Sequence, residues 1–152
     1  MEERGQEQIG MEIKVLYNLY RRINDTYGNS NYIKGVCGSN LWIIGYLTMN
    51  EGKDVFQKDL EKQFSIRRST ASKTLQLMED KGLIRREPVF YDARLKKIIL
   101  TDKALEIHKM IVEDIQNANT IASKGISQEE LNSFFSVADK MIKNLEDYIN
   151  KD

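Results

Sequence analysis

The chain has 152 residues, of which 41% are hydrophobic and 30% charged, and its formal net charge is zero at pH 7. That length is enough to bury the core of one domain, and no apolar run is long enough for a membrane-spanning helix. A single Pro and nine Gly favour a mostly helical fold, and a single cysteine, Cys37, excludes an internal disulfide framework. The charged first ten residues lack an apolar signal region. A soluble, cytoplasmic protein is expected.

The first predicted helix covers residues 9–27. Its apolar residues recur at alternating spacings of four and three, as in a heptad seam. They are Ile9, Ile13, Leu16, Tyr20, Ile23 and Tyr27. Such a helix must be buried, either in the core of its own subunit or against a second subunit. Residues 28–38 form a polar, Gly-containing turn cluster.

Cys37 lies just before the next predicted helix. A lone cysteine usually behaves as a small buried hydrophobe. Redox sensing would require a lowered thiol pKa and solvent access, and nothing nearby in the sequence supplies them.

Residues 40–49 form an apolar segment whose length suits a buried strand or a buried helix. We predict a helix, because the segment leads directly into the two helices predicted next in the chain. Trp42 and Tyr46 are four residues apart on it and are expected in the core. The alternative is that they form an aromatic wall of a ligand cavity.

A short helix is predicted after Asp54, because Val55, Phe56, Leu60 and Phe64 recur at about one helical turn. Its start fits a capping box in which Asp54 and Gln57 are three residues apart. Ser65 marks the turn that follows.

A second helix is predicted from about Arg68 to Lys81. Its inner face carries Ala71, Leu75 and Met78, and Gly82 supplies the left-handed residue that ends it. Its start is instead rich in cations and short hydroxyl side chains, which let a helix approach a DNA groove and contact phosphates and base edges. The predicted DNA-binding residues here are Arg67, Arg68, Ser69, Thr70, Ser72 and Lys73.

After Gly82 the pattern changes to two β-branched, apolar runs of strand length, residues 83–87 and 96–101. We predict a hairpin whose loop is residues 88–95, with Pro88 at the strand end. Arg94 would be at the tip of this wing, where a narrow minor groove attracts an inserted arginine. Lys96 is predicted to bind DNA with it.

Zero net charge by itself argues against binding to nucleic acid, but the charges are unevenly distributed. Residues 67–97 hold nine Lys or Arg and four Asp or Glu, and the rest of the chain holds 14 and 19. Because phosphate attraction depends on the local field, screened over about 8 Å at physiological salt, this segment suits DNA. The alternative is a solvated charged surface.

The last two helices are predicted from capping signals. Thr101 caps a helix that runs to about Ser123, with Leu100 and Leu105 as a hydrophobic staple. After a break at residues 124–125, Ser127 and Glu130 form a capping box for a helix that runs to Asn150. Its broad apolar stripe favours a two-fold dimer interface, together with the first helix, over a monomeric cap on the core.

Catalytic signals are weak. His108 is the only histidine and lies on a helix without a partner at metal-ligand spacing. No phosphate-binding Gly loop and no Ser-His-Asp order is present. We expect no enzyme, no metal and no cofactor.

The sequence of the segment from Asp54 to Thr101 resembles the MarR family of bacterial transcription regulators. The resemblance implies obligate homodimers that bind palindromes, usually as repressors, and that often release DNA on binding a small phenolic or lipophilic molecule. Positions that match the family pattern are Ser69, Thr70, Gly82, Asp92, Arg94, Leu100 and Thr101. Positions that depart from it are Phe56 and Arg67 at the usual caps, Ser65 at the usual turn glycine, and Ala104 at another common glycine.

The sequence therefore predicts a mainly α fold with a small β wing, a winged helix-turn-helix with N- and C-terminal dimerisation helices. Its expected parts are residues 1–36 (dimerisation helix and loop), 37–101 (DNA-binding lobe) and 102–152 (dimerisation helices). The expected function is that of a dimeric regulator that binds palindromic double-stranded DNA, as a repressor released by a small aromatic or lipophilic effector. Candidate effector-binding residues are Tyr20, Trp42, Tyr46 and His108. The alternative function is a winged-helix module that docks on protein.

Overall fold

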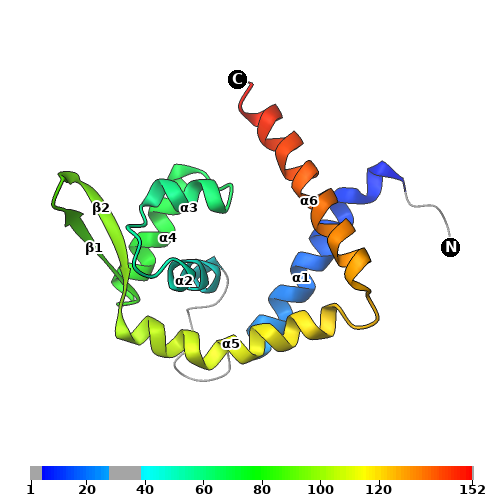
Figure 1. Cartoon of the computed structure of the whole chain (residues 1–152), viewed down its shortest axis with the longest axis horizontal. Helices are drawn as coiled ribbons and strands as arrows, with labels where there is room; N and C mark the ends of the chain where they lie inside the picture. The colour runs from blue at the N-terminus through cyan, green and yellow to red at the C-terminus, as the bar shows by residue number, and fades with distance from the viewer. Residues whose placement is uncertain (1–4, 28–38, 152) are drawn as a thin grey trace. The chain divides into compact units, whose positions relative to one another are not determined.

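The computed structural model describes residues 5–27 and 39–151 (Figure 1). It is mainly helical, with one two-stranded antiparallel sheet, and confirms the predicted fold class. The elements are η1 (Gln6–Gln8), α1 (Ile9–Tyr27), α2 (Ser39–Met49), α3 (Gln57–Gln63), α4 (Arg68–Asp80), β1 (Ile84–Val89), β2 (Asp92–Leu100), α5 (Asp102–Ala122) and α6 (Gln128–Ile149). The turn cluster at 28–38, with Cys37, lies outside the described residues. The predicted three-part division of the chain remains a prediction.

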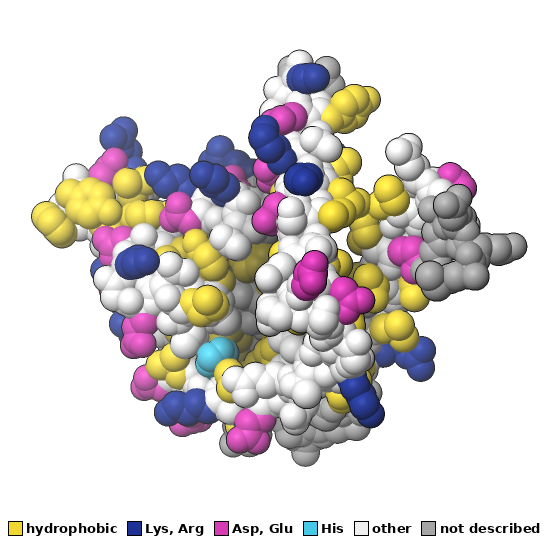
Figure 2. All heavy atoms as spheres, turned by 45° about the vertical axis from the view of Figure 1, so that its right-hand side comes forward, with side chains coloured by type: hydrophobic (Ala, Val, Ile, Leu, Met, Phe, Trp, Pro, Cys, Tyr) yellow, Lys and Arg dark blue, Asp and Glu magenta, His cyan; other side chains and the backbone are white. Residues whose placement is uncertain are grey.

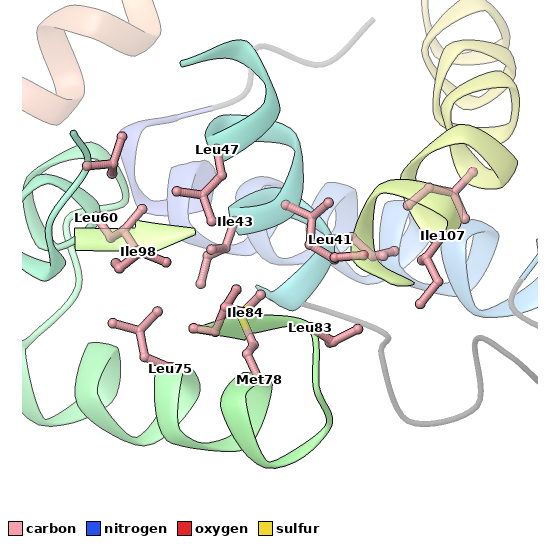
Figure 3. Close-up of a cluster of buried hydrophobic side chains, with 14 residues drawn as sticks. Leu41, Ile43, Leu47, Leu60, Leu75, Met78, Leu83, Ile84, Ile98 and Ile107 are labelled. Atoms are coloured by element: carbon pink, nitrogen blue, oxygen red, sulfur yellow. The ribbon is translucent and has the colours of Figure 1, made fainter. Parts of the chain in front are cut away.

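The chain forms two compact units that divide between Ala118 and Asn119, within α5. The first unit holds a continuous apolar core. Figure 3 shows side chains from α2, α3, α4, both strands and α5 pointing toward one another. The most deeply buried large residues are Ile43, Ile44, Leu60, Leu75, Met78, Leu83 and Ile107. Because one face of α4 and the base of the wing both pack in this core, the core fixes the two elements against each other.

The start of α3 differs from the sequence prediction. Phe56, not Asp54, is the N-cap residue, and the Asp59 carboxylate accepts a hydrogen bond from the Phe56 N–H at 2.8 Å. Asp54 is bonded instead to Lys97, whose Nζ donates to it at 3.0 Å. The predicted Asp54–Gln57 capping box is therefore wrong.

The two helices of the helix-turn-helix end in the same way. After α3, the Ile66 N–H donates to the Glu61 carbonyl at 3.0 Å and Ser65 has φ +46°. After α4, the Leu83 N–H donates to the Met78 carbonyl at 2.9 Å and Gly82 has φ +67°. Both are Schellman motifs, which need a left-handed residue just past the helix. The turn at Ser65 and the stop at Gly82 are confirmed.

The wing is longer than predicted and its loop is shorter. Only Phe90 and Tyr91 lie between the strands, so the predicted loop at 88–95 is wrong. Pro88 lies inside β1, opposite Lys96, and Val89 pairs with Asp92. Residues 93–95 therefore have no partner across the sheet and form a bulge in β2. Arg94 lies on this bulge and not at the tip.

Residues 39–49 are helical, which confirms the choice of helix over strand for the apolar segment. Tyr46 packs edge-on against the Phe64 ring at 5.8 Å. Trp42 is 52% exposed, so its expected place in the core of the subunit is wrong. Since α2 is apolar on all sides, periodicity could not tell which of its residues would face outward.

The later helices begin where the capping signals predicted. The Thr101 hydroxyl accepts from the Ala104 N–H at 3.4 Å. The Glu130 carboxylate accepts from the Ser127 N–H at 2.8 Å, and the Ser127 hydroxyl accepts from the Glu130 N–H at 3.2 Å. Figure 2 shows hydrophobic side chains along one side of α6. No helix in the described ranges combines the length and apolar character needed to cross a membrane.

Candidate nucleic-acid interface

The first half of α4 presents a polar, cationic face. Ala71, Leu75 and Met78 bury the opposite face in the core. All six residues predicted to bind DNA at this end of α4 are exposed: Arg67, Arg68, Ser69, Thr70, Ser72 and Lys73. α4 is thus held on one side and open on the other, as a helix that enters a groove must be.

The cations on this face differ from those at the base of the wing. Within residues 5–27 and 39–151, the side chains of Arg67, Arg68 and Lys73 make no ion pair or hydrogen bond. In contrast, Arg85 pairs with Glu87 at 2.8 Å on the surface of β1. These side chains are therefore available to contact an external partner.

Arg86 joins the wing to α4. Its Nε donates to the Glu79 carboxylate at 3.0 Å, and one terminal nitrogen donates to Gln76 at 3.1 Å and also to Glu79. These bonds lower the pKa of Glu79 below its ordinary value. Arg86 therefore links the wing to α4. Because its guanidinium is bonded to the Glu79 carboxylate, Arg86 is less available than Arg67, Arg68 and Lys73 to bind an external anion.

The bulge in β2 projects Arg94, whose side chain is 92% exposed. Asp92 holds it: the Arg94 N–H donates to Asp92 Oδ1 at 3.0 Å, and the guanidinium donates to both carboxylate oxygens at 3.2 and 3.3 Å. These bonds lower the pKa of Asp92. Bulges commonly re-aim a side chain, and here the bulge and the carboxylate together direct Arg94 outward. Lys96, the other predicted wing residue, is also exposed.

A network that the sequence did not predict joins the wing to the segment that leads into α3. Asp54 accepts from Lys97 and, at 3.4 Å, from the hydroxyl of Tyr91. The Ile98 N–H donates to the Val55 carbonyl at 2.8 Å. Burial and the Asp54 carboxylate raise the pKa of Tyr91. No local signal joins Asp54 to residues about 40 positions later, so only the fold reveals this network.

The four candidate effector residues are not gathered in one described cavity. Tyr20, Tyr46 and His108 are half-buried and Trp42 is exposed. A cavity of about 310 Å³ lies instead between the end of α2, β2 and the start of α5, lined among others by Leu47, Asp54, Lys97, Ile98 and Leu105. The role of the four candidate residues as an effector site therefore remains a prediction.

Sequence and structure comparisons show what this arrangement is similar to. A model of the MarR family matches residues 34–95. The transcription regulator MarR from Oenococcus oeni is 30% identical, with a TM-score of 0.73, over 89% of this chain and 98% of that one. The chain belongs to the MarR family of transcription regulators.

Two more distant MarR-like structures share the fold. A putative MarR family regulator from Listeria monocytogenes, solved in complex with 26mer DNA, is 23% identical with a TM-score of 0.76, over 99% of this chain and 96% of that one. The heme sensor PefR from Streptococcus agalactiae, solved in complex with heme, is 22% identical with a TM-score of 0.62, over 94% and 95%. The elements that carry the candidate interface of this MarR-family chain thus have counterparts in both folds.

The fold and the family are those of transcription regulators rather than enzymes. Among the residues that the structure describes, no group of three or more His, Cys, Asp or Glu side chains is placed to hold a metal ion.

Proposed function

We propose that this MarR-family regulator is a homodimer that binds a palindromic DNA operator and represses transcription until a small aromatic or lipophilic molecule releases it. It has no catalytic activity, and it acts where bacterial DNA is accessible, in the cytoplasm. The observation that carries the proposal is the row of exposed, unpaired cations and hydroxyls on the first half of α4.

The roles of individual residues follow from chemistry. Arg68 and Lys73 reach guanine edges or phosphates in the major groove, and Ser69 and Thr70 allow a close approach of the helix. Arg94 enters the flanking minor groove, whose negative potential attracts a guanidinium. The 26mer DNA complex of the Listeria relative supports DNA binding by this fold.

Dimerisation explains apolar side chains that a single subunit leaves exposed. α1 and α6 each carry a row of them: Ile9, Ile13 and Leu16 on α1, and Phe134, Phe135, Ile142, Leu145 and Tyr148 on α6. Large exposed apolar patches mark association sites. In a two-fold dimer the two α4 helices would meet half-sites about 10 base pairs apart.

An effector would act by changing the spacing of the two α4 helices. It need only bind one arrangement of the dimer better than the other. The heme sensor PefR, which shares the fold, supports a ligand-responsive regulator in general. Tyr20, Trp42, Tyr46 and His108 are the residues we propose for the effector, since an aromatic, apolar wall suits an aromatic or lipophilic molecule.

The test is selection of the purified chain against a random duplex pool at physiological salt, followed by sequencing of the bound fraction. A palindrome with half-sites about one helical turn apart is expected. Affinity for the recovered site should fall steeply as the salt concentration rises, since binding displaces counterions from phosphates.

Variants then assign the contacts. Arg68→Ala and Lys73→Ala should each cost about 1–3 kcal/mol if the side chain reads a base, whereas a phosphate contact gives a uniform loss over sequences. Lys124→Ala, an exposed lysine between α5 and α6, is the control and should leave affinity unchanged. If no duplex is enriched, or if Arg68→Ala and Lys73→Ala bind the site as tightly as the control Lys124→Ala, the proposed interface on α4 is wrong. A protein-docking role then gains support.

A further inference from the structure

The tip of the wing carries an aromatic residue that no described part of the chain covers. Phe90 is 100% exposed, and the neighbouring Tyr91 is 55% exposed. One exposed apolar residue alone needs no explanation, but Phe90 is distinguished by its place in the wing and by its neighbours.

Phe90 and Tyr91 occupy the two central positions of the hairpin turn, between the paired residues Val89 and Asp92. Two-residue hairpin turns favour Gly, Asn and Asp, because the favoured turn types need a positive φ. Within the described residues the only non-glycine with a positive φ is Ser65, so neither turn residue adopts that conformation. Turn geometry therefore does not explain why two aromatic residues lie here.

The Phe90 ring is also held in place. It packs edge-on against the Tyr91 ring, with centroids 5.2 Å apart and planes at 87°. The Tyr91 hydroxyl donates to Asp54, which Lys97 also bonds. The exposed ring thus has one neighbour, Tyr91, that is itself hydrogen-bonded to the fold, and a contact residue positioned in this way loses less entropy on binding.

The neighbouring charges indicate the partner. Asp92 pairs with Val89 to close the turn that carries Phe90, and its carboxylate also orients Arg94. The same residue therefore fixes the positions of Phe90 and Arg94 relative to the wing. Figure 2 shows hydrophobic side chains at the outer end of the wing with Lys and Arg side chains beside them. Proteins that bind the minor groove combine arginine with an apolar wedge that partly unstacks a base step.

We infer that Phe90 is a wedge that contacts the minor groove of duplex DNA beside Arg94 and partly unstacks one base step in each flank of the operator. This inference rests on the proposed function. Tyr91 acts as a positioning residue for the ring. Phe90 would then select for flexible pyrimidine–purine steps at positions flanking the half-sites, because these steps unstack most easily.

The experiment uses the full chain and the duplex recovered by selection, with 2-aminopurine placed in turn at each flanking position. Wild type should raise the fluorescence at one position in each flank, since the fluorescence of this base increases on unstacking. Phe90→Ala should abolish the rise and weaken binding about tenfold, or about 1.4 kcal/mol. Phe90→Trp should retain both. Because Phe90 is fully exposed, neither variant should affect folding.

Met49→Ala is the matched control, since Met49 is 86% exposed at the end of α2. If Phe90→Ala binds and fluoresces like wild type while Arg94→Ala loses affinity, the wedge is overturned and the proposed function stands. If wild type enriches no duplex, both are overturned. Unchanged DNA binding by Phe90→Ala with loss of capture of a partner protein would assign the wing tip to protein and also overturn the wedge.

Discussion

Replacing Ser65 by glycine should stabilise the protein, because the helix-turn-helix closes on a residue that is in the left-handed region. Ser65 has φ +46°. That conformation costs a non-glycine residue about 1–2 kcal/mol, whereas glycine loses about 0.5–1 kcal/mol more backbone entropy on folding. The net gain expected for Ser65→Gly is about 0.5–1 kcal/mol. The reciprocal Gly82→Ser should destabilise by about as much, since a Cβ at Gly82 meets nothing within 4 Å and only the conformation is penalised.

Urea denaturation at one fixed protein concentration measures both changes, because the stability of the proposed dimer would depend on concentration. Ser65→Ala is the control: it removes the hydroxyl but keeps a Cβ in the left-handed region. Ser65→Gly should therefore have a higher midpoint than Ser65→Ala and wild type. A midpoint for Ser65→Gly no higher than that of Ser65→Ala, or unfolding of Gly82→Ser like wild type, would show that the left-handed conformation is not penalised at these positions.

Three further changes test the fold and the assembly. Because Arg86 lowers the pKa of Glu79 below 4.5, the ionised pair stabilises the fold above that pH and the effect is lost as the pH falls through the lowered value. Glu79→Gln should therefore cost about 0.5–1 kcal/mol near neutral pH, and the cost should shrink as the pH falls below 4.5 through the lowered pKa of Glu79; a cost that does not change with pH in urea unfolding would contradict this. Leu75→Ala, at a fully buried position, should cost about 2–5 kcal/mol in the same assay, and a smaller loss would mean that the core collapses around it. Phe135→Asp should give a folded monomer in sedimentation, since Phe135 is 57% exposed in one subunit; an intact dimer would exclude α6 from the interface.

The parts of the fold that local chemistry determines could be predicted from the sequence. α1 begins at Ile9 and ends at Tyr27 as its apolar spacing indicates. Gly82 ends α4, and Ser127 with Glu130 starts α6, because these signals involve neighbours within one turn. The exposed cations of α4 were likewise predictable, since the opposite side of the helix carries a clear apolar stripe.

The rest depended on contacts between distant residues. Asp54 is a good cap by type, but its carboxylate is bonded to Lys97, 43 positions later. Pro88 is a usual strand end, yet pairing continues through it because the neighbouring strand absorbs three extra residues as a bulge. Trp42 faces outward from a helix that is apolar all round, and no periodic pattern records which side the core will use.

Pro88 has one more consequence, for what happens when the wings of two molecules meet. β1 is one of only two strands in its sheet, so its outer backbone has no partner strand within the described residues. Such an edge can pair with the same edge of another molecule and start aggregation. Pro88 has no N–H to offer, and Arg85 and Glu87 place charges along the same strand. Pro88, in β1, thus helps to keep the wings of different molecules from pairing with one another.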